Sequence, residues 1–162
     1  MTPKEIIIEY NILTEYRTKL QNFLGSKVKV LIGGSYALKF QLEEFKDRHI
    51  HDYDFIVIGK EENLSEIKNR LEELVSLHII RKNANYKDAL TYQLPMLNGK
   101  NCDLILEPNN QSLIDVQIFD TPEHILEIKK KWVVQRTLKG ISSRSKDLKD
   151  IEILEEIVSL PF

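Results

Sequence analysis

The spacing of apolar residues along the chain predicts several helices. Stripes that repeat every three or four residues indicate them, and capping residues, proline or glycine mark their ends. Thr2-Pro3 opens the first helix and Gly25 ends it, while Asn63 and Glu66 form a capping-box pattern before the third. The helices expected in this way cover about 3–24, 35–45, 63–77, 121–140 and 145–160.

Short runs rich in β-branched and aromatic residues predict strands between these helices. Asn98-Gly99 separates two such runs. Because a type I′ turn needs positive φ at both central positions, the pair predicts an antiparallel hairpin. Another run ends apolar on both faces, as expected for a central strand of a covered sheet. The strands are expected at 28–32, 51–58, 78–81, 90–97, 101–106 and 115–119.

Elements in this order predict one domain of the α/β or α+β class, with helices packed on a mixed β-sheet. The 162 residues are 42% hydrophobic, which is enough for one sizeable core and too little to argue for two domains. We expect the core at about 26–120 and a C-terminal helical pair at about 121–160. The pattern alone leaves the strand order open.

Composition narrows the classes of function. A net charge of -2 with 30% charged residues gives no global field that attracts nucleic acid or membranes, so any polyanion binding has to be local. A single cysteine, Cys102, excludes an internal disulfide. No apolar run approaches about 18 residues and the start lacks a signal-peptide pattern. We therefore expect a cytoplasmic protein without membrane contact.

Two glycines lie between a predicted strand and a predicted helix. Gly33 and Gly34 let backbone N–H groups approach a ligand, and the positive end of the following helix faces the same place, so an anion fits there. Ser35 adds a hydroxyl donor, and Lys39 adds charge if it leans back. The turn lacks the features of a Walker loop and of a Rossmann fingerprint. The alternative to anion binding is that the two glycines are needed only for packing.

Three aspartates are candidate metal ligands. Asp52 and Asp54 project from the same face of a strand, because strand side chains alternate. Asp103 starts an otherwise apolar strand, where an unpaired carboxylate is costly. Such an oxygen-only set suits Mg²⁺ or Mn²⁺. A solvated strand end and a turn residue remain the alternatives for these positions.

Together these motifs resemble a known family. Gly-Gly-Ser-Tyr-Ala-Leu at 33–38 and Asp-Tyr-Asp-Phe-Ile-Val at 52–57 look like the motif pair of the polymerase-beta-type nucleotidyltransferase superfamily, and Asp103 in Cys-Asp-Leu-Ile-Leu matches its third carboxylate. The resemblance implies that the turn orients the β- and γ-phosphates of an NTP. It also implies that two Mg²⁺ ions bind the carboxylates, namely Asp52, Asp54 and Asp103.

The C-terminal part carries a weaker resemblance. The segment 121–150, with three successive lysines and an Arg-Ser-Lys-Asp-Leu-Lys-Asp stretch, is similar to the C-terminal helices of AbiEii-type toxins and related minimal nucleotidyltransferases. Carried over, Lys146 contacts phosphate and Asp147 or Asp150 orients the site. The chain is much shorter than the full toxins. A solvated basic helix face is the alternative reading of this segment.

Two other kinds of site fit the sequence less well. His51-Asp52 looks like the dyad of HD-type phosphohydrolases, but that dyad needs helical histidines and these residues start a strand. His49, His51 and Cys102 offer too few ligands, at the wrong spacing, for structural zinc.

The sequence therefore predicts a Mg-dependent nucleotidyltransferase that transfers a nucleoside monophosphate from an NTP to an acceptor hydroxyl. The acceptor stays open between an RNA end such as that of tRNA, a protein and a small molecule. The main alternative is an inactive protein of the same fold that binds a nucleotide or a protein partner, for example within a toxin–antitoxin or phage-defence system.

Overall fold

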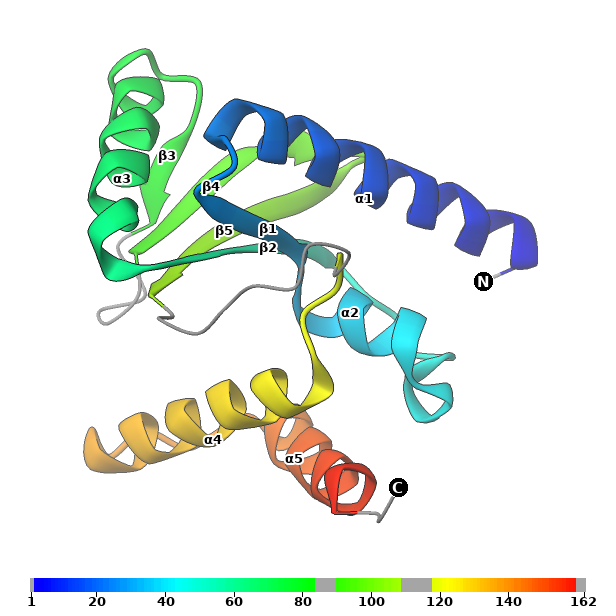
Figure 1. Cartoon of the computed structure of the whole chain (residues 1–162). Coiled ribbons are helices and arrows are strands. Elements are labelled where there is room, and N and C mark those ends of the chain that lie inside the picture. Colours follow the sequence, from blue (N-terminus) through cyan, green and yellow to red (C-terminus); the bar gives the residue numbers. More distant parts are fainter. Residues whose placement is uncertain (1, 84–89, 109–117, 160–162) are drawn as a thin grey trace.

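The computed structural model describes residues 2–83, 90–108 and 118–159. Helices and strands alternate through the first part of the chain, and two helices end it (Figure 1). Among the described residues, no helix combines the length and apolar character needed to span a bilayer. In chain order the elements are α1 Pro3–Leu24, β1 Val28–Ile32, α2 Gly34–Gln41, the 3-10 turn η1 Glu43–Phe45, β2 Asp52–Gly59, α3 Glu61–Ser76, β3 Arg81–Asn83, β4 Leu90–Leu97, β5 Lys100–Pro108, α4 Pro122–Leu138 and α5 Ser145–Val158.

The five strands form one mixed sheet in the order β1-β2-β5-β4-β3, which confirms the predicted fold class. Only β2 and β5 pair in parallel among these strands, and the other three pairings are antiparallel. A single parallel bridge also joins Ile32 at the end of β1 to Phe119. The neighbouring strands β2 and β5 therefore start at the same edge of the sheet.

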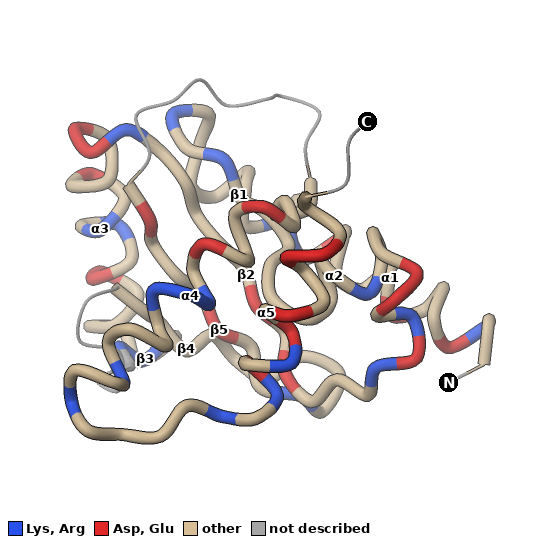
Figure 2. The backbone as a smooth tube through the Cα atoms, turned by 90° about the horizontal axis from the view of Figure 1, so that it is seen from below, with Lys and Arg blue, Asp and Glu red and all other residues tan. Residues whose placement is uncertain are grey.

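One sheet face lies toward the C-terminal helices. Figure 1 shows α4 and α5 on the side of the sheet opposite α1, and Figure 2 views the molecule from their side. On this face Leu31, Ile56 and Ile58 form a small buried cluster. The two helices also pack on α2 through a second cluster, which comprises Ala37, Leu38, Phe45, Ile125, Leu126 and Leu154.

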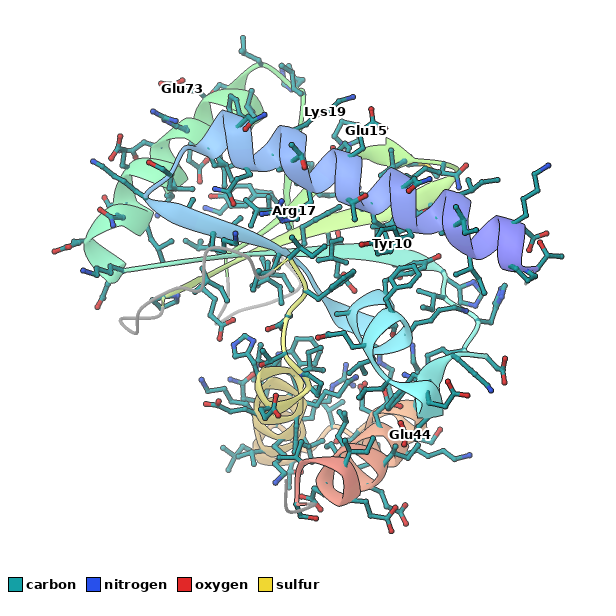
Figure 3. The ribbon with its side chains drawn as sticks, turned by 45° about the vertical axis from the view of Figure 1, so that its right-hand side comes forward. Tyr10, Glu15, Arg17, Lys19, Glu44 and Glu73 are labelled. Atoms are coloured by element: carbon teal, nitrogen blue, oxygen red, sulfur yellow. The ribbon has the colours of Figure 1, made fainter. Side chains whose placement is uncertain are left out.

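The opposite sheet face carries the main core, covered by α1 and α3. Figure 3 shows Arg17 pointing from α1 toward the sheet while Glu15 and Lys19 point away from it. Arg17 Nε donates to the carbonyl of Val30 at 2.7 Å, which supplies a partner for a buried cation. The strand residues of this core are Val28, Val30, Ile32, Tyr53, Phe55, Val57, Tyr92, Leu94, Cys102, Leu104 and Leu106.

The strongest local signals are confirmed. Thr2 and Glu5 form a capping box at the start of α1. Asn98 and Gly99 have φ of 50° and 73°, as the predicted type I′ hairpin requires. The helix expected at 121–140 is present as α4, opened by the side chain of Thr121.

Several expected boundaries are wrong. The helix predicted at 35–45 ends at Gln41, because Leu42 takes an extended conformation before η1. The Asn63 cap is also wrong, since α3 begins at Glu61 directly after Lys60, without a side-chain cap. The strand expected at 78–81 is delayed because His78 has a φ of 57°.

Two further expectations concern the C-terminal third. Residues 115–117 of the strand predicted at 115–119 lie outside the described residues, and the rest is reduced to the bridge of Phe119. The last helix is present as α5, which ends at Val158.

A histidine fastens the start of α4 to the sheet. His124 Nδ1 lies 2.6 Å from Asp120 Oδ1, and its Nε2 lies 2.9 Å from Glu107 Oε1 at the end of β5. Burial alone lowers the pKa of His124, but the hydrogen bonds and charges of the two carboxylates raise it to about 10. His124 is therefore a half-buried imidazolium that joins α4 to the sheet.

The first prediction concerns the pH dependence of this contact. A histidine whose pKa is raised in the folded protein stabilises it fully below its ordinary value near 6.5 and loses this contribution as the pH rises toward about 10. Between pH 6.5 and 8.5, the free energy of unfolding should fall by about 2 kcal/mol more in the wild type than in His124→Gln. Urea unfolding at several pH values measures this difference. If the free energy of unfolding changed with pH in the same way in both proteins, the imidazolium would not contribute to stability.

Candidate active site

The glycine turn packs directly against β2. The amide of Gly33 donates to the carbonyl of Asp54 at 2.8 Å, so this amide is not available to a ligand. Gly34 has a φ of 59°, and a Cβ added to it would lie 2.3 Å from Asp54 Oδ2. Only glycine combines this backbone conformation with so close an approach. The glycines therefore do serve packing, as the alternative explanation of the turn held. This packing places the turn against the carboxylate of Asp54.

The start of α2 offers the remaining amides of the turn. The N-cap is Gly33, which has no side chain that could cap the free amides of the helix. The first intrahelical bond runs from the amide of Ala37 to the carbonyl of Gly33, which leaves the amides of Gly34, Ser35 and Tyr36 without a partner inside the helix. Such amides, together with the positive end of the helix dipole, attract an anion.

The parallel pairing of β2 and β5 brings the aspartates together. Asp54 lies directly opposite Asp103, and Asp52 lies opposite Asn101. Because strand side chains alternate, all three carboxylates belong to the sheet face that α4 and α5 approach (Figure 2). Asp52 is exposed, whereas Asp54 and Asp103 are half-buried. Residues from two distant segments thus form one acidic patch.

This patch carries negative charge that few contacts offset. Burial raises the pKa of Asp54 to about 6, and the charges of Asp103 and Asp52 add to the rise, while Lys129 and Lys146 oppose it. Burial and then Asp52 also raise the pKa of Asp103. Within the described part of the chain, none of the three carboxylates accepts a hydrogen bond or forms an ion pair. The patch is therefore suited to receive a cation.

The two lysines predicted at the phosphates lie in different places. Lys146 at the start of α5 has its Nζ 3.4 Å from Ser35 Oγ, beside the glycine turn. Lys39 points elsewhere, since its buried ammonium donates to the carbonyl of Arg48 at 2.8 Å. The expectation that Lys39 leans back toward the turn is thus not met by its contacts. Positive charge reaches the turn from α5 instead.

A network of charges between α4 and α5 lies next to these groups. Lys129 Nζ lies 3.0 Å from Asp147 Oδ1 and 3.2 Å from Asp150 Oδ2, and Arg48 pairs with both oxygens of Asp150. The sequence indicated the two aspartates but neither Lys129 nor Arg48 as partners. One sequence signal could have found them. Asp147 and Asp150 lie three positions apart on one face of a helix, and two neighbouring carboxylates favour cationic partners on that face.

The donor set fits a hard divalent cation better than zinc. His49 and His51 have ring centroids 4.5 Å apart, but Cys102 lies buried on the opposite sheet face. No three His, Cys, Asp or Glu side chains in the described ranges are arranged so that they could hold a metal together. Mg²⁺ commonly binds one or two carboxylates and completes its shell with water and substrate phosphates. The facing pair, Asp54 and Asp103, offers such carboxylates.

Comparison with solved structures gives several matches, and the two described below have TM-scores of 0.40 and 0.42. No protein-family model and no curated protein matches the sequence. A cytoplasmic RNA terminal U-transferase matches with 15% identity and a TM-score of 0.40 over 68% of this chain, which spans only 31% of that protein. JHP933 from Helicobacter pylori matches with 16% identity and a TM-score of 0.42, over 96% of this chain and 68% of that one. Likenesses of this strength decide neither family nor function.

The second prediction concerns the glycine turn. Gly34→Ala should lower the free energy of unfolding by at least about 2 kcal/mol more than Gly140→Ala does, because both have positive φ but only Gly34 faces the Asp54 carboxylate. In the described part of the chain, no residue other than the two chain neighbours has an atom within 4 Å of a Cβ added at Gly140. Urea titration of the two variants measures the difference. Equal losses would mean that the turn does not pack tightly on β2.

The third prediction concerns the stability of the acidic patch. An acid whose pKa is raised from 3.8 to about 6 in the folded protein destabilises it increasingly as the pH rises through this range. In EDTA at pH 7.5, Asp54→Asn should therefore increase the free energy of unfolding by about 1–2 kcal/mol, with no increase at pH 3.5. Asp47→Asn, at an exposed position before β2, is the control. If Asp54→Asn were less stable than the wild type at pH 7.5, the charge of Asp54 would not destabilise the folded protein, and the prediction would be wrong.

Proposed function

We propose that this chain is a metal-dependent nucleotidyltransferase. In the proposed reaction the oxygen of an acceptor hydroxyl forms a bond to the α-phosphorus of an NTP. The bond from that phosphorus to the bridging oxygen breaks, and pyrophosphate leaves. The hydroxyl proton passes to a carboxylate of the protein. The observation that carries the proposal is the register of β2 and β5, which places Asp54 opposite Asp103 on the face against which the glycine turn packs.

The glycine turn and α5 supply groups for the triphosphate. The first amides of α2 and the Ser35 hydroxyl can donate to phosphate oxygens, and Lys146 adds an ammonium 3.4 Å from that hydroxyl. These donors lie beside Asp54, since Gly34 contacts its carboxylate. A triphosphate held here has its phosphates next to the acidic patch.

The carboxylates have the chemistry that Mg²⁺ or Mn²⁺ requires. Asp54 and Asp103 offer oxygen ligands, repel each other, and make no ion pair among the described residues. A bound divalent cation supplies positive charge that offsets the charge developing on the phosphates. Asp52, exposed at the start of β2, was expected as a third ligand, but the described acids are not arranged so that three of them hold one ion, and Asp52 adds negative charge beside the pair.

Asp103 is the candidate proton acceptor. It stands at the edge where β2 and β5 start, it is only half-buried, and its pKa is raised above the ordinary value by burial and by Asp52. A more basic carboxylate accepts a proton more readily from a hydroxyl group. The acceptor itself stays open between an RNA end, a protein and a small molecule.

A second candidate function is nucleotide binding without transfer, with a protein partner in place of an acceptor. Lys129 and Lys146 lie close enough to Asp54 to lower its pKa, so they partly replace the charge that a metal ion brings. This arrangement favours binding of a nucleotide by the basic groups alone. Binding of an NTP that persists in EDTA, with no release of pyrophosphate when Mg²⁺ is added, would identify this function.

The fourth prediction tests transfer directly. The protein is incubated with Mg²⁺ and each labelled NTP, with total RNA or a protein extract as the source of acceptor. Asp54→Asn and Asp103→Asn should each lower the rate of pyrophosphate release at least about 100-fold. Each substitution removes a negative charge that would hold the divalent cation, and that cation would stabilise the charge of the transition state. Both variants should keep the circular dichroism spectrum of the wild type.

Asp47→Asn serves as the matched control, since it removes an exposed carboxylate five positions before Asp52. It should retain the activity of the wild type. Unchanged pyrophosphate release by Asp54→Asn would exclude the proposed mechanism, whatever the acceptor.

A further inference from the structure

An arginine outside the proposed site forms a bidentate ion pair with a buried aspartate. Both terminal nitrogens of Arg48 pair with the two carboxylate oxygens of Asp150, and the Nη1–Oδ2 distance is 2.8 Å. The Asp150 side chain has 0% exposure, and the guanidinium also lies 4.6 Å from the ring centroid of Phe45. This two-pronged contact with a stacked guanidinium is specific to arginine, because a lysine offers a single point charge.

The same buried carboxylate ties together the two C-terminal helices. Lys129 on α4 lies 3.2 Å from Asp150 Oδ2 and 3.0 Å from Asp147 Oδ1, both on α5. Burial alone raises the pKa of Asp150, but Arg48 and Lys129 outweigh burial and lower it. Asp150 therefore stays ionised and holds cations from two other segments.

Arg48 also reaches the elements that carry the proposed site. It lies four positions before Asp52, in the segment that leads into β2, and its carbonyl accepts a hydrogen bond from Lys39 of α2. One residue thus joins the start of α5 to the helix of the glycine turn and to the strand of the acids. We call this set of contacts, made by Arg48, Asp150, Lys129 and Lys39, the α5 clamp.

The position of Lys146 depends on this clamp. Lys146 is adjacent to Asp147 on the first turn of α5, and its ammonium lies 3.4 Å from Ser35 Oγ. In the described part of the chain Lys146 forms no ion pair of its own. Its ammonium therefore stays at the glycine turn only while the backbone of α5 is held there.

We propose that Arg48 is a positioning residue for the nucleotide's phosphates, acting through Asp150 to hold Lys146 at Ser35. This inference rests on the proposed function, because it assumes that an NTP binds at the turn. A purely structural role for Arg48 makes a different prediction. Loss of such a contact lowers stability but leaves nucleotide affinity unchanged at temperatures where each variant is folded.

The fifth prediction uses a fluorescent ATP or GTP analogue with Mg²⁺ and measures its Kd. Arg48→Lys keeps the charge, so the protein should fold, but it loses the two-pronged contact and should raise Kd about tenfold. Lys146→Met should raise Kd by a similar factor. The double variant should bind as Lys146→Met does, within about twofold, because Arg48 acts only through Lys146.

The matched control is Lys130→Met, which breaks the exposed ion pair of Lys130 and Glu155 between the same two helices. It should leave Kd unchanged. Equal Kd for Arg48→Lys and the wild type would overturn the proposal, as would full additivity of the two substitutions in the double variant.

Hydrogen exchange without nucleotide tests the clamp separately from the proposed function. In Arg48→Lys the amides of residues 147–150 should exchange about tenfold faster than in the wild type, whereas Lys130→Met should leave them unchanged. Unchanged exchange in Arg48→Lys would overturn the clamp even if the nucleotide binds. A wild type that binds no NTP but shows the exchange effect would instead overturn the proposed function, and with it the phosphate role of Lys146.

Discussion

The parallel pairing of β2 with β5 is the constraint on which the rest of the structure depends. Its register sets Asp54 beside Asp103, and the same pairing places Cys102 and Leu104 in the core. A shift by one residue would turn the carboxylates into the core and the apolar side chains toward α4 and α5. The main core that fixes the sheet therefore also fixes the candidate site.

The acidic patch and the charged contacts of α5 are two different solutions to buried charge. Asp150 is fully buried, but two cations hold it ionised. Among the residues that the structure describes, Asp54 has no such partner, and burial together with its acidic neighbours raises its pKa. An uncompensated carboxylate is costly in a folded protein, and strain of this kind is common where a protein binds a ligand. The contrast makes Asp54 rather than Asp150 the candidate position for binding an external cation.

The sequence predicted what is local and missed what is distant. Thr2-Pro3, Asn98-Gly99 and Thr121-Pro122 act within a few residues, and the elements they mark were found. Alternation along one strand placed Asp52 and Asp54 on the same face, but the position of Asp103 beside them follows from a strand order that no local pattern contains. Arg48 was missed because its partner Asp150 is about 100 positions away. Lys39 was misplaced because rotamer choice depends on its packed surroundings.

The separation of the paired acids along the chain has a consequence for folding. β2 and β5 are joined by a parallel contact across about fifty residues, and contacts of this kind close late because a long loop loses entropy first. Lys146 is contributed later still, by the last helix of the described chain. A partly folded or partly synthesised molecule thus has Asp54, Asp103 and Lys146 still apart from one another. For this reason the groups of the candidate site come together only after the long-range contacts have closed, which places them late in folding.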